Sequence, residues 1–258
     1  MKADDITILI QGPINQTSLD NIENYLKFGR VLVKYWENDE KENLLFSHEL
    51  TNQFDKEKAK QNPEEFHGTF RWQVDGAYFG LKKVKTKYAI RTRSDESFSD
   101  LRPLIDIFKE NPNKIVCGNI FWRDSDAGGL GNHRHIGDHI LMGSTETLLK
   151  GYELIKEIHD KREFPRGWGF LSREHSENPE NGLYANCLKA FKLLNPDVKT
   201  TNILDVFDFI NVIKLGNYKI SRSHPEPGHW TNQNPMAEDF KRSLSLIEER
   251  CQLEGRSI

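Results

Sequence analysis

The first 36 residues show the pattern of a strand, a helix and a second strand, in the order that is typical of a parallel α/β sheet. Residues 6–10 (Ile-Thr-Ile-Leu-Ile) form a continuous β-prone run, the pattern of a strand that is buried on both faces. Gly12 and Pro13 end this run, and apolar residues then recur at helical spacing over residues 18–28. Residues 31–36 predict the second strand. Because a strand–helix–strand unit of this length joins parallel strands, we expect an α/β fold with a mostly parallel central sheet flanked by helices.

The same alternation continues along the chain, although the second half is less regular. No repeat, low-complexity tract or linker separates the elements, so we expect one domain over residues 1–258 with an irregular C-terminal region. The expected strands cover 86–92, 115–117, 136–142, 203–206 and 209–213, and the expected helices cover 70–81, a stretch from Pro103, 145–159, a stretch from Pro179, and 237–253.

Composition and charge exclude several classes of protein. Lys and Arg number 36 against 39 Asp and Glu, and the lysines form no basic stripe, so we expect no nucleic-acid partner. The three cysteines lie far apart without metal-ligand spacing, which suits a reducing compartment rather than a disulfide framework. No apolar stretch reaches the length of a signal-peptide core or a membrane span, so we expect a cytoplasmic protein without an integral membrane segment. Peripheral contact with a membrane surface stays open.

The strongest candidate site lies at the end of the strand expected near residue 92. Asp95 follows Arg91 and Arg93 there, in the run Arg-Thr-Arg-Ser-Asp. Open α/β sheets bind ligands at the carboxyl ends of their strands. A carboxylate beside arginines can hold a divalent cation and bridge it to a diphosphate. The alternative is that Arg91 and Asp95 form ordinary surface ion pairs.

A second candidate site is the turn Gln11-Gly12-Pro13 after the first strand. A glycine here lets the backbone approach a nucleotide closely, and the helix N-terminus behind it favours anions. The sequence carries neither a GxGxxG motif nor the lysine of a P-loop. An ordinary strand-to-helix turn is therefore the alternative.

Two histidine-containing clusters add candidate metal ligands. Residues 133–139 (His-Arg-His-Ile-Gly-Asp-His) contain several ligand types, and Asp138 is placed to face a cleft. Residues 223–230 contain His224, which can complete a metal site, and Trp230, which can stack on a sugar. Solvated loop histidines and a turn anchored by a tryptophan are the alternatives.

An acidic segment supplies a candidate general base. Glu174, Glu177 and Glu180 lie close together, and Glu180 opens an expected helix directly after Pro179. A carboxylate near a site can deprotonate an acceptor hydroxyl. Favourable interaction with the helix dipole is the alternative reason for an acid at this position.

Five short motifs follow one another along the chain: residues 8–14 (Ile-Leu-Ile-Gln-Gly-Pro-Ile), Trp36, Arg71-Trp72-Gln73 leading to Gly80-Leu81, Tyr88 to Asp95, and Ile136-Gly137-Asp138 through Gly143. Taken in order, they resemble the WavE-type lipopolysaccharide-synthesis proteins, which are placed among glycosyltransferases of the GT-A fold. The similarity covers about residues 6–190, and the acidic helix start at Glu180 fits its later part.

The resemblance implies a GT-A-like, Rossmann-type domain. Its nucleotide-sugar-binding half would cover about 1–120 and its acceptor-side half about 121–258, with a Mn²⁺ or Mg²⁺ ion at Asp95. Arg93 stands where the family's Asp-x-Asp metal motif has its first aspartate, so Arg93 can itself neutralise phosphate charge and the cation is expected to be partly or wholly dispensable. The expected site residues are Gln11, Gly12, Pro13, Arg71 and Arg93 for the nucleotide, Asp95 and His224 for the metal, and Glu180, then Asp138, for the base.

The function implied is transfer of a sugar from a nucleotide-sugar donor to a saccharide or lipid-linked glycan, in cell-surface polysaccharide, lipopolysaccharide or glycoprotein glycan synthesis. Two alternatives stay open. A metal-dependent phosphoesterase would use His133, His135, Asp138 and His224, and would release phosphate or a nucleoside monophosphate without an acceptor. A catalytically inactive GT-A-like module would retain glycans and bind no nucleotide.

Overall fold

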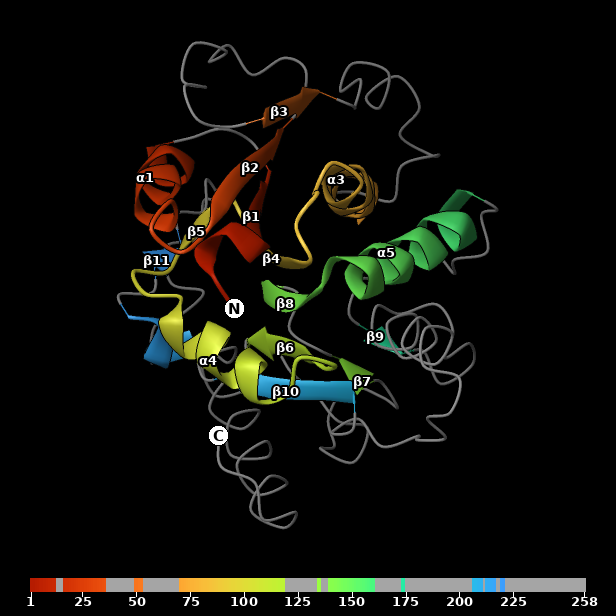
Figure 1. The fold of residues 1–258 in the computed structure, drawn as a ribbon. Coiled ribbons are helices and arrows are strands. Elements are labelled where there is room, and N and C mark those ends of the chain that lie inside the picture. Colours follow the sequence, from red (N-terminus) through yellow and green to blue (C-terminus); the bar gives the residue numbers. More distant parts are fainter. Residues whose placement is uncertain are drawn as a thin grey trace, which may run out of the picture.

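A computed structural model describes residues 1–12, 16–35, 49–52, 70–118, 134–135, 139–160, 173–174, 206–210, 212–216 and 219–220. These residues form an α/β fold whose centre is a mixed, mostly parallel sheet with helices on both faces (Figure 1). The fold class expected from the sequence is confirmed. None of the described helices is long and apolar enough to cross a membrane.

The central sheet has seven strands in the order β10-β6-β8-β4-β1-β2-β3. β8 runs antiparallel to β4 and β6, and the remaining neighbours are parallel. Two small antiparallel sheets pair β5 (Glu96–Ser97) with β11 (Lys219–Ile220), and β7 (Arg134–His135) with β9 (Arg173–Glu174). The central strands are β1 (Ile6–Gln11), β2 (Arg30–Tyr35), β3 (Glu49–Asn52), β4 (Tyr88–Arg93), β6 (Ile115–Gly118), β8 (Ile140–Ser144) and β10 (Phe207–Ile210).

Helices cover the sheet in two layers, which lie on opposite sides in Figure 1. On one face, α1 (Gln16–Tyr25) contacts β2 and β5, and α4 (Arg102–Glu110) contacts β6, β8 and β10. On the other face, α3 (Phe70–Leu81) packs on β1 and β2, and α5 (Thr145–Asp160) packs on β4, β8 and α3. Short 3-10 helices cover Ala3–Asp5 and Val212–Leu215.

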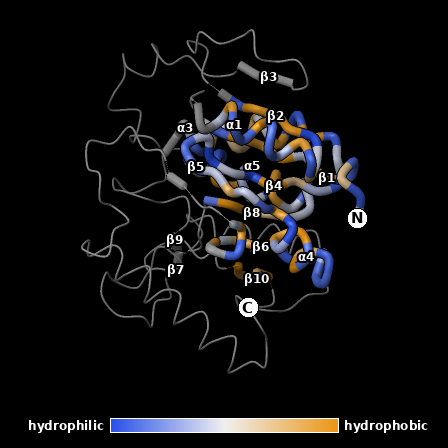
Figure 2. The backbone as a smooth tube through the Cα atoms, turned by 90° about the vertical axis from the view of Figure 1, so that its left-hand side faces the viewer, coloured by the Kyte–Doolittle hydropathy of each residue, from blue (hydrophilic) through white to orange (hydrophobic). Residues whose placement is uncertain are grey.

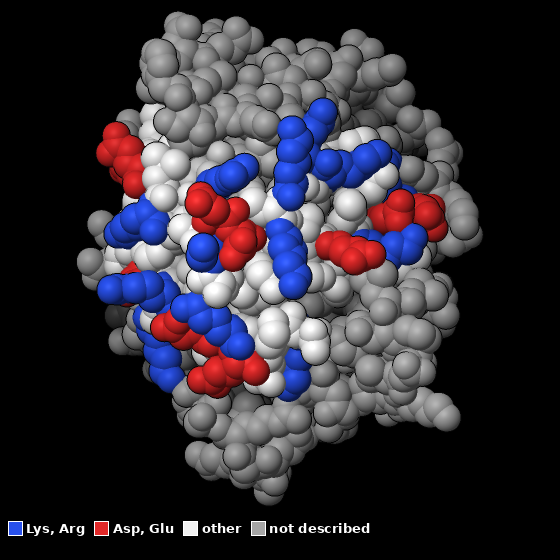
Figure 3. Space-filling model, in the orientation of Figure 1, with Lys and Arg blue, Asp and Glu red and all other residues white. Residues whose placement is uncertain are grey.

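The first strand is buried throughout because both of its faces are covered. Ile6, Ile8 and Ile10 belong to the core cluster that contains Tyr25 and Phe108 from α1 and α4. The alternate residue Leu9 lies against α3, and it too is fully buried. Figure 2 shows hydrophobic residues concentrated along these inner strands, and Figure 3 shows acidic and basic side chains interspersed on the described part of one face.

Several element boundaries differ from the expectation. β8 starts at Ile140 and ends at Ser144, because its ladder pairs Thr92 with Ile140 and Tyr88 with Ser144. The strand expected over 209–213 ends at Ile210 opposite the last residue of β6, and residues 212–215 form a 3-10 helix. Val206, expected in a strand, has helical backbone. The expected helices after Pro179 and over 237–253 lie outside the described residues.

Side chains of α1 hold the segment that follows β4. Asn21 Nδ2 donates to the carbonyl of Glu96 at 2.5 Å, and Asn24 Nδ2 donates to the carbonyl of Phe98 at 2.8 Å. The main-chain N–H of Phe98 donates to the hydroxyl of Tyr25 at 3.1 Å. Burial raises the pKa of Tyr25 well above its ordinary value. The helix thereby fixes the backbone of β5 beside the end of β4.

Tyr25→Phe is expected to lower the free energy of unfolding by about 1–3 kcal/mol at pH 7, because it removes the acceptor for a buried N–H. The difference in free energy of unfolding between the wild type and the variant should narrow above pH 10. There the tyrosine ionises in the unfolded chain but stays protonated in the folded one, so the wild type loses about 1.4 kcal/mol by pH 11. Urea unfolding of both proteins at pH 7, 10 and 11 measures this. A difference that stays constant through pH 11 would contradict the burial of a neutral Tyr25.

Candidate functional site

The strand order places a ligand-binding edge between β1 and β4. The chain leaves β1 toward β2 on one side, and β4 later joins β1 on the other side, also in parallel. Open α/β sheets bind ligands outside the carboxyl ends of the strands at such a switch point. Gln11 and Gly12 end β1 there, and Arg93, Ser94 and Asp95 end β4. The structure thus brings together two segments that the sequence analysis treated as separate candidate sites.

Main-chain contacts join these two strand ends closely. The N–H of Gly12 donates to the carbonyl of Lys34 at 3.0 Å, and the N–H of Ser94 donates to the carbonyl of Gln11 at 2.8 Å. Gly12 has a φ of 136°, and a Cβ at this position would lie 2.2 Å from Ser94 Oγ. Only glycine fits this turn, because both the backbone conformation and the space exclude a side chain.

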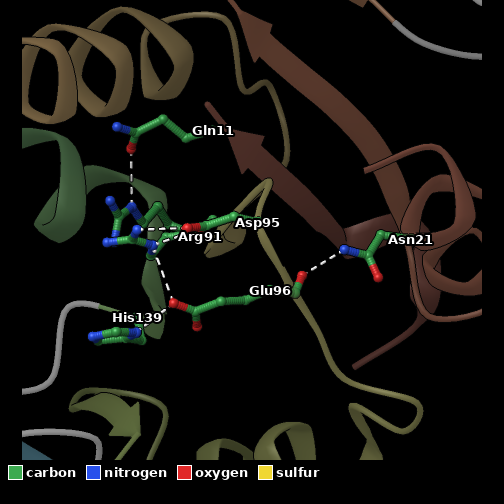
Figure 4. Close-up of polar contacts among 7 residues, drawn as sticks. Gln11, Asn21, Arg91, Asp95, Glu96 and His139 are labelled. Atoms are coloured by element: carbon green, nitrogen blue, oxygen red, sulfur yellow. Dashed lines mark hydrogen bonds and ion pairs between the residues drawn. The ribbon is translucent and has the colours of Figure 1, made fainter. Parts of the chain in front are cut away.

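Arg91 and Gln11 lie beneath this edge, on the face that α3 covers. Arg91 is fully buried and is not a surface residue, and its Nε donates to Gln11 Oε1 at 3.0 Å (Figure 4). Gln11 Nε2 in turn donates to the carbonyl of Gln73 in α3 at 2.9 Å. A Cβ on Gly76 would lie 2.9 Å from Gln11 Cγ, so this glycine lets α3 approach the amide. The Gln11 side chain therefore braces Arg91 against α3.

Arg93 carries the most accessible positive charge of this edge. Its Nε and Nη2 donate to the two carboxylate oxygens of Asp95 at 2.9 and 2.8 Å. Nε also lies 3.1 Å from Glu96 Oε1. The side chains of Arg93 and Asp95 are 21% and 22% exposed, whereas that of Glu96 is fully buried. Two carboxylates of different depth thus hold one guanidinium that solvent still reaches.

The strand register adds further basic residues to the same face. Gln11 is opposite Lys34 on one side and Arg93 on the other, and Leu9 is opposite Arg91. Side chains at paired positions share a face, so Lys34, Arg91 and Arg93 all lie on the α3 side of the sheet. Lys34 and Arg91 are buried, whereas Arg93 is partly exposed. This edge therefore brings together a row of three basic residues, of which Arg93 is the one that solvent reaches.

His139 and Glu96 belong to this cluster; the sequence analysis placed His139 only within the candidate metal-ligand run 133–139 and gave Glu96 no role. His139 precedes β8 and is 4% exposed, and its Nδ1 forms a hydrogen bond with Glu96 Oε1 (Figure 4). Glu96 could have been noticed from its place directly after Asp95 at a strand end. The contact of His139 with Glu96 could not have been predicted, because it depends on the antiparallel pairing of β8 with β4.

The carboxylates described at this edge are engaged by neighbouring side chains. Both carboxylate oxygens of Asp95 accept hydrogen bonds from Arg93, and Glu96 Oε1 is engaged by Arg93 and His139. Among the residues that the structure describes, no group of three His, Cys, Asp or Glu side chains is placed to hold a metal ion. Asp95 is thus bound to an arginine in the place where the resemblance implied a metal.

No protein-family model and no curated protein matches the sequence. Solved structures that resemble it include glycosyltransferases and a nucleotidyltransferase. A glycosyltransferase involved in glycosylation of the major capsid of PBCV-1 has a TM-score of 0.40 at 12% identity, over 93% of this chain and 98% of that one. The apo-form glycosyltransferase GlyE of Streptococcus pneumoniae TIGR4 has a TM-score of 0.42 at 11% identity, over 98% and 64%. The inositol-1-phosphate CTP transferase of T. maritima has a TM-score of 0.44 at 12% identity, over 99% of both chains.

The side chains of the remaining expected site residues lie outside the described part of the chain. Arg71 belongs to the first turn of α3, but its side chain lies outside the described part of the chain. Pro13, Asp138, Glu180 and His224 also lie outside it, as does His133 of the phosphoesterase alternative. Their roles, and the WavE-type assignment, stay predictions.

Proposed function

We propose that this chain is a nucleotide-sugar-dependent glycosyltransferase that binds its donor at the carboxyl ends of β1 and β4. The observation that carries the proposal is the partly exposed Arg93 beside the side-chain-free backbone of Gly12 at the switch point of the sheet. A diphosphate needs a cation with directional donors and a backbone that lets it approach. This edge offers both within two adjacent strands.

The chemistry of sugar transfer suits this row of cations. An acceptor hydroxyl oxygen bonds to the anomeric carbon of the donor while the bond from that carbon to the phosphate oxygen breaks. The hydroxyl proton passes to a carboxylate base, and the nucleoside diphosphate leaves with an additional negative charge. Cations that are already in place stabilise that charge in the transition state. In this proposal Arg93 supplies this stabilisation, with the buried Lys34 and Arg91 behind it.

The WavE resemblance extends the proposal to residues outside the described part of the chain. Glu180 is proposed as the base on the acceptor, with Asp138 as the second candidate, and Arg71 as a further phosphate contact. Pro13 would complete the turn against the nucleotide. The acceptor proposed is a saccharide or lipid-linked glycan of the cell surface.

A binding screen tests the function directly. The purified protein is heated with UDP, GDP, CDP, CMP, dTDP and their sugars, once with EDTA and once with Mn²⁺. A nucleotide present at 100 times its Kd adds about 2.7 kcal/mol to the free energy of unfolding, which shifts the Tm of a domain of this size by about 5–10 °C. We expect one nucleoside diphosphate and its sugar to produce this shift, also in EDTA.

Other outcomes of this screen, and of assays for phosphate and pyrophosphate release run beside it, would overturn the proposal. A shift with glycans but with no nucleotide would indicate a binding module. Release of phosphate without an acceptor would indicate the phosphoesterase. Formation of pyrophosphate from a nucleoside triphosphate and a sugar phosphate would indicate nucleotidyl transfer.

A further inference from the structure

Glu96 is the buried centre of the candidate site, and the proposed function alone gives it no role. Its side chain is fully buried, yet Oε1 faces both Nε of Arg93 at 3.1 Å and Nδ1 of His139. Its main-chain carbonyl accepts a hydrogen bond from Asn21 of α1. The side chain and the backbone of this one residue therefore contact three separate parts of the fold, namely β4, the residue before β8, and α1.

Stability alone is a weak reason to keep a carboxylate at this position. Removing a charged group from water carries a large desolvation cost, and well-packed apolar residues often replace buried ion pairs without loss of stability. Arg93 is different from Glu96, because part of its side chain remains exposed at the edge of the sheet. The buried acid thus holds a cation that a ligand can reach.

The two carboxylates hold Arg93 in different ways. Asp95 is itself partly exposed and lies two residues from Arg93 on the same turn, so it can move together with the arginine. Glu96 is enclosed, and its second partner, His139, precedes a different strand. Contacts to Asp95 orient the plane of the guanidinium, whereas the contact with Glu96, which His139 also holds, fixes its position relative to β8.

We propose that Glu96 and His139 are a pair of positioning residues that holds the Arg93 guanidinium where the diphosphate of the donor binds. The inference rests on the proposed function. In the pair, Nδ1 of His139 carries the hydrogen that it donates to Glu96 Oε1, so the histidine orients the carboxylate and the carboxylate orients Arg93. The role of His139 is to donate one hydrogen bond, not to transfer a proton.

Three variants separate this role from general packing. His139→Asn places an amide N–H near the position of Nδ1 and keeps the donor, whereas His139→Phe keeps an aromatic ring without it. Glu96→Gln keeps the shape of the side chain and removes its charge. Asp106→Asn is the control, because Asp106 forms a comparable but exposed pair with Lys109 away from the site.

Affinity for UDP, GDP, CDP and dTDP, and for the corresponding nucleosides, is measured by calorimetry with each variant. We expect His139→Phe and Glu96→Gln to weaken diphosphate binding at least tenfold and to leave nucleoside binding unchanged. His139→Asn should stay within threefold of the wild type, and Asp106→Asn should match it. Loss of diphosphate binding in His139→Asn as large as in His139→Phe would overturn the proposal, and so would an unaltered affinity in Glu96→Gln.

A second measurement needs no ligand and separates failure of this inference from failure of the proposed function. We expect the Nε–H signal of Arg93 in ¹⁵N NMR spectra to be protected from solvent exchange, because Asp95 and Glu96 both accept from it. Protection should stay at the wild-type level in His139→Asn and should decrease in His139→Phe and Glu96→Gln, in which only the contact with Asp95 remains. If the wild type binds none of the four diphosphates, both the proposed function and the role of Arg93 in diphosphate binding are wrong. If the protection of the Arg93 Nε–H does not depend on Glu96 and His139, the positioning role is wrong even where nucleotide binding is found.

Discussion

Arg93→Met is expected to weaken binding of the donor's nucleoside diphosphate by at least 10²-fold. The guanidinium is the cation of this edge that is partly exposed, and it can form two charge-assisted hydrogen bonds to a phosphate. Each such bond contributes about 1.5–3 kcal/mol, so the loss of two corresponds to about 10²-fold or more in Kd. Calorimetry with the diphosphate identified in the screen measures the effect.

Two further variants make this result specific. Arg93→Lys keeps the charge without the planar fork and should lie between the wild type and the methionine variant. Arg102→Met is the matched control, because Arg102 pairs with Asp100 through Nε and Nη2 as Arg93 does with Asp95, but at a 76% exposed position. Since Arg93→Met leaves Asp95 and Glu96 without their cation, circular dichroism must show that the variant is folded. A folded variant with unaltered diphosphate affinity would contradict the role of Arg93.

Glu180→Gln is expected to lower sugar transfer at least 10²-fold and to leave binding of the nucleoside diphosphate unchanged. A positioned general base contributes about 10²–10⁴-fold to the rate, and a glutamine keeps the shape of the side chain without accepting a proton. Transfer is measured as acceptor-dependent release of the nucleoside diphosphate.

Glu177→Gln is the matched control for this experiment, because it removes a carboxylate from the same acidic segment. Its transfer rate should equal that of the wild type. Wild-type transfer by Glu180→Gln would exclude Glu180 as the base, and Asp138→Asn would then be the next variant to measure.

The parts of the fold that could be predicted are those in which neighbours in sequence are also neighbours in space. The pattern of β1, α1 and β2 is local, and it correctly predicted a parallel unit with a tight turn at Gly12. The basic and acidic residues at the end of β4 were also visible, because they occupy consecutive positions. The sequence analysis considered an ion pair of Asp95 with Arg91, whereas the structure pairs Asp95 with Arg93.

The parts that could not be predicted depend on pairing between distant strands. Burial of Arg91 follows from the position of β4 between β1 and β8, both fully covered by helices. The contact of His139 with Glu96 needs the register in which Thr92 lies opposite Ile140. The local pattern of a five-residue strand such as β8 determines neither which strands it pairs with nor the register of that pairing. The sequence analysis therefore grouped His139 with the loop residues before it.

The antiparallel strand β8 also constrains the order in which the chain can assemble during synthesis. β6 is made before β8, but both of its neighbours in the sheet, β8 and β10, are made after it. The edge of β4 that pairs with β8 likewise stays unpaired until β8 has been made. Among the described strands, a growing chain that ends before residue 140 therefore has three unpaired edges, both edges of β6 and one of β4, and β8 closes two of them. Exposed edges of this kind invite pairing with other chains, so the time between synthesis of β6 and β8 is the interval in which this protein is most exposed to aggregation.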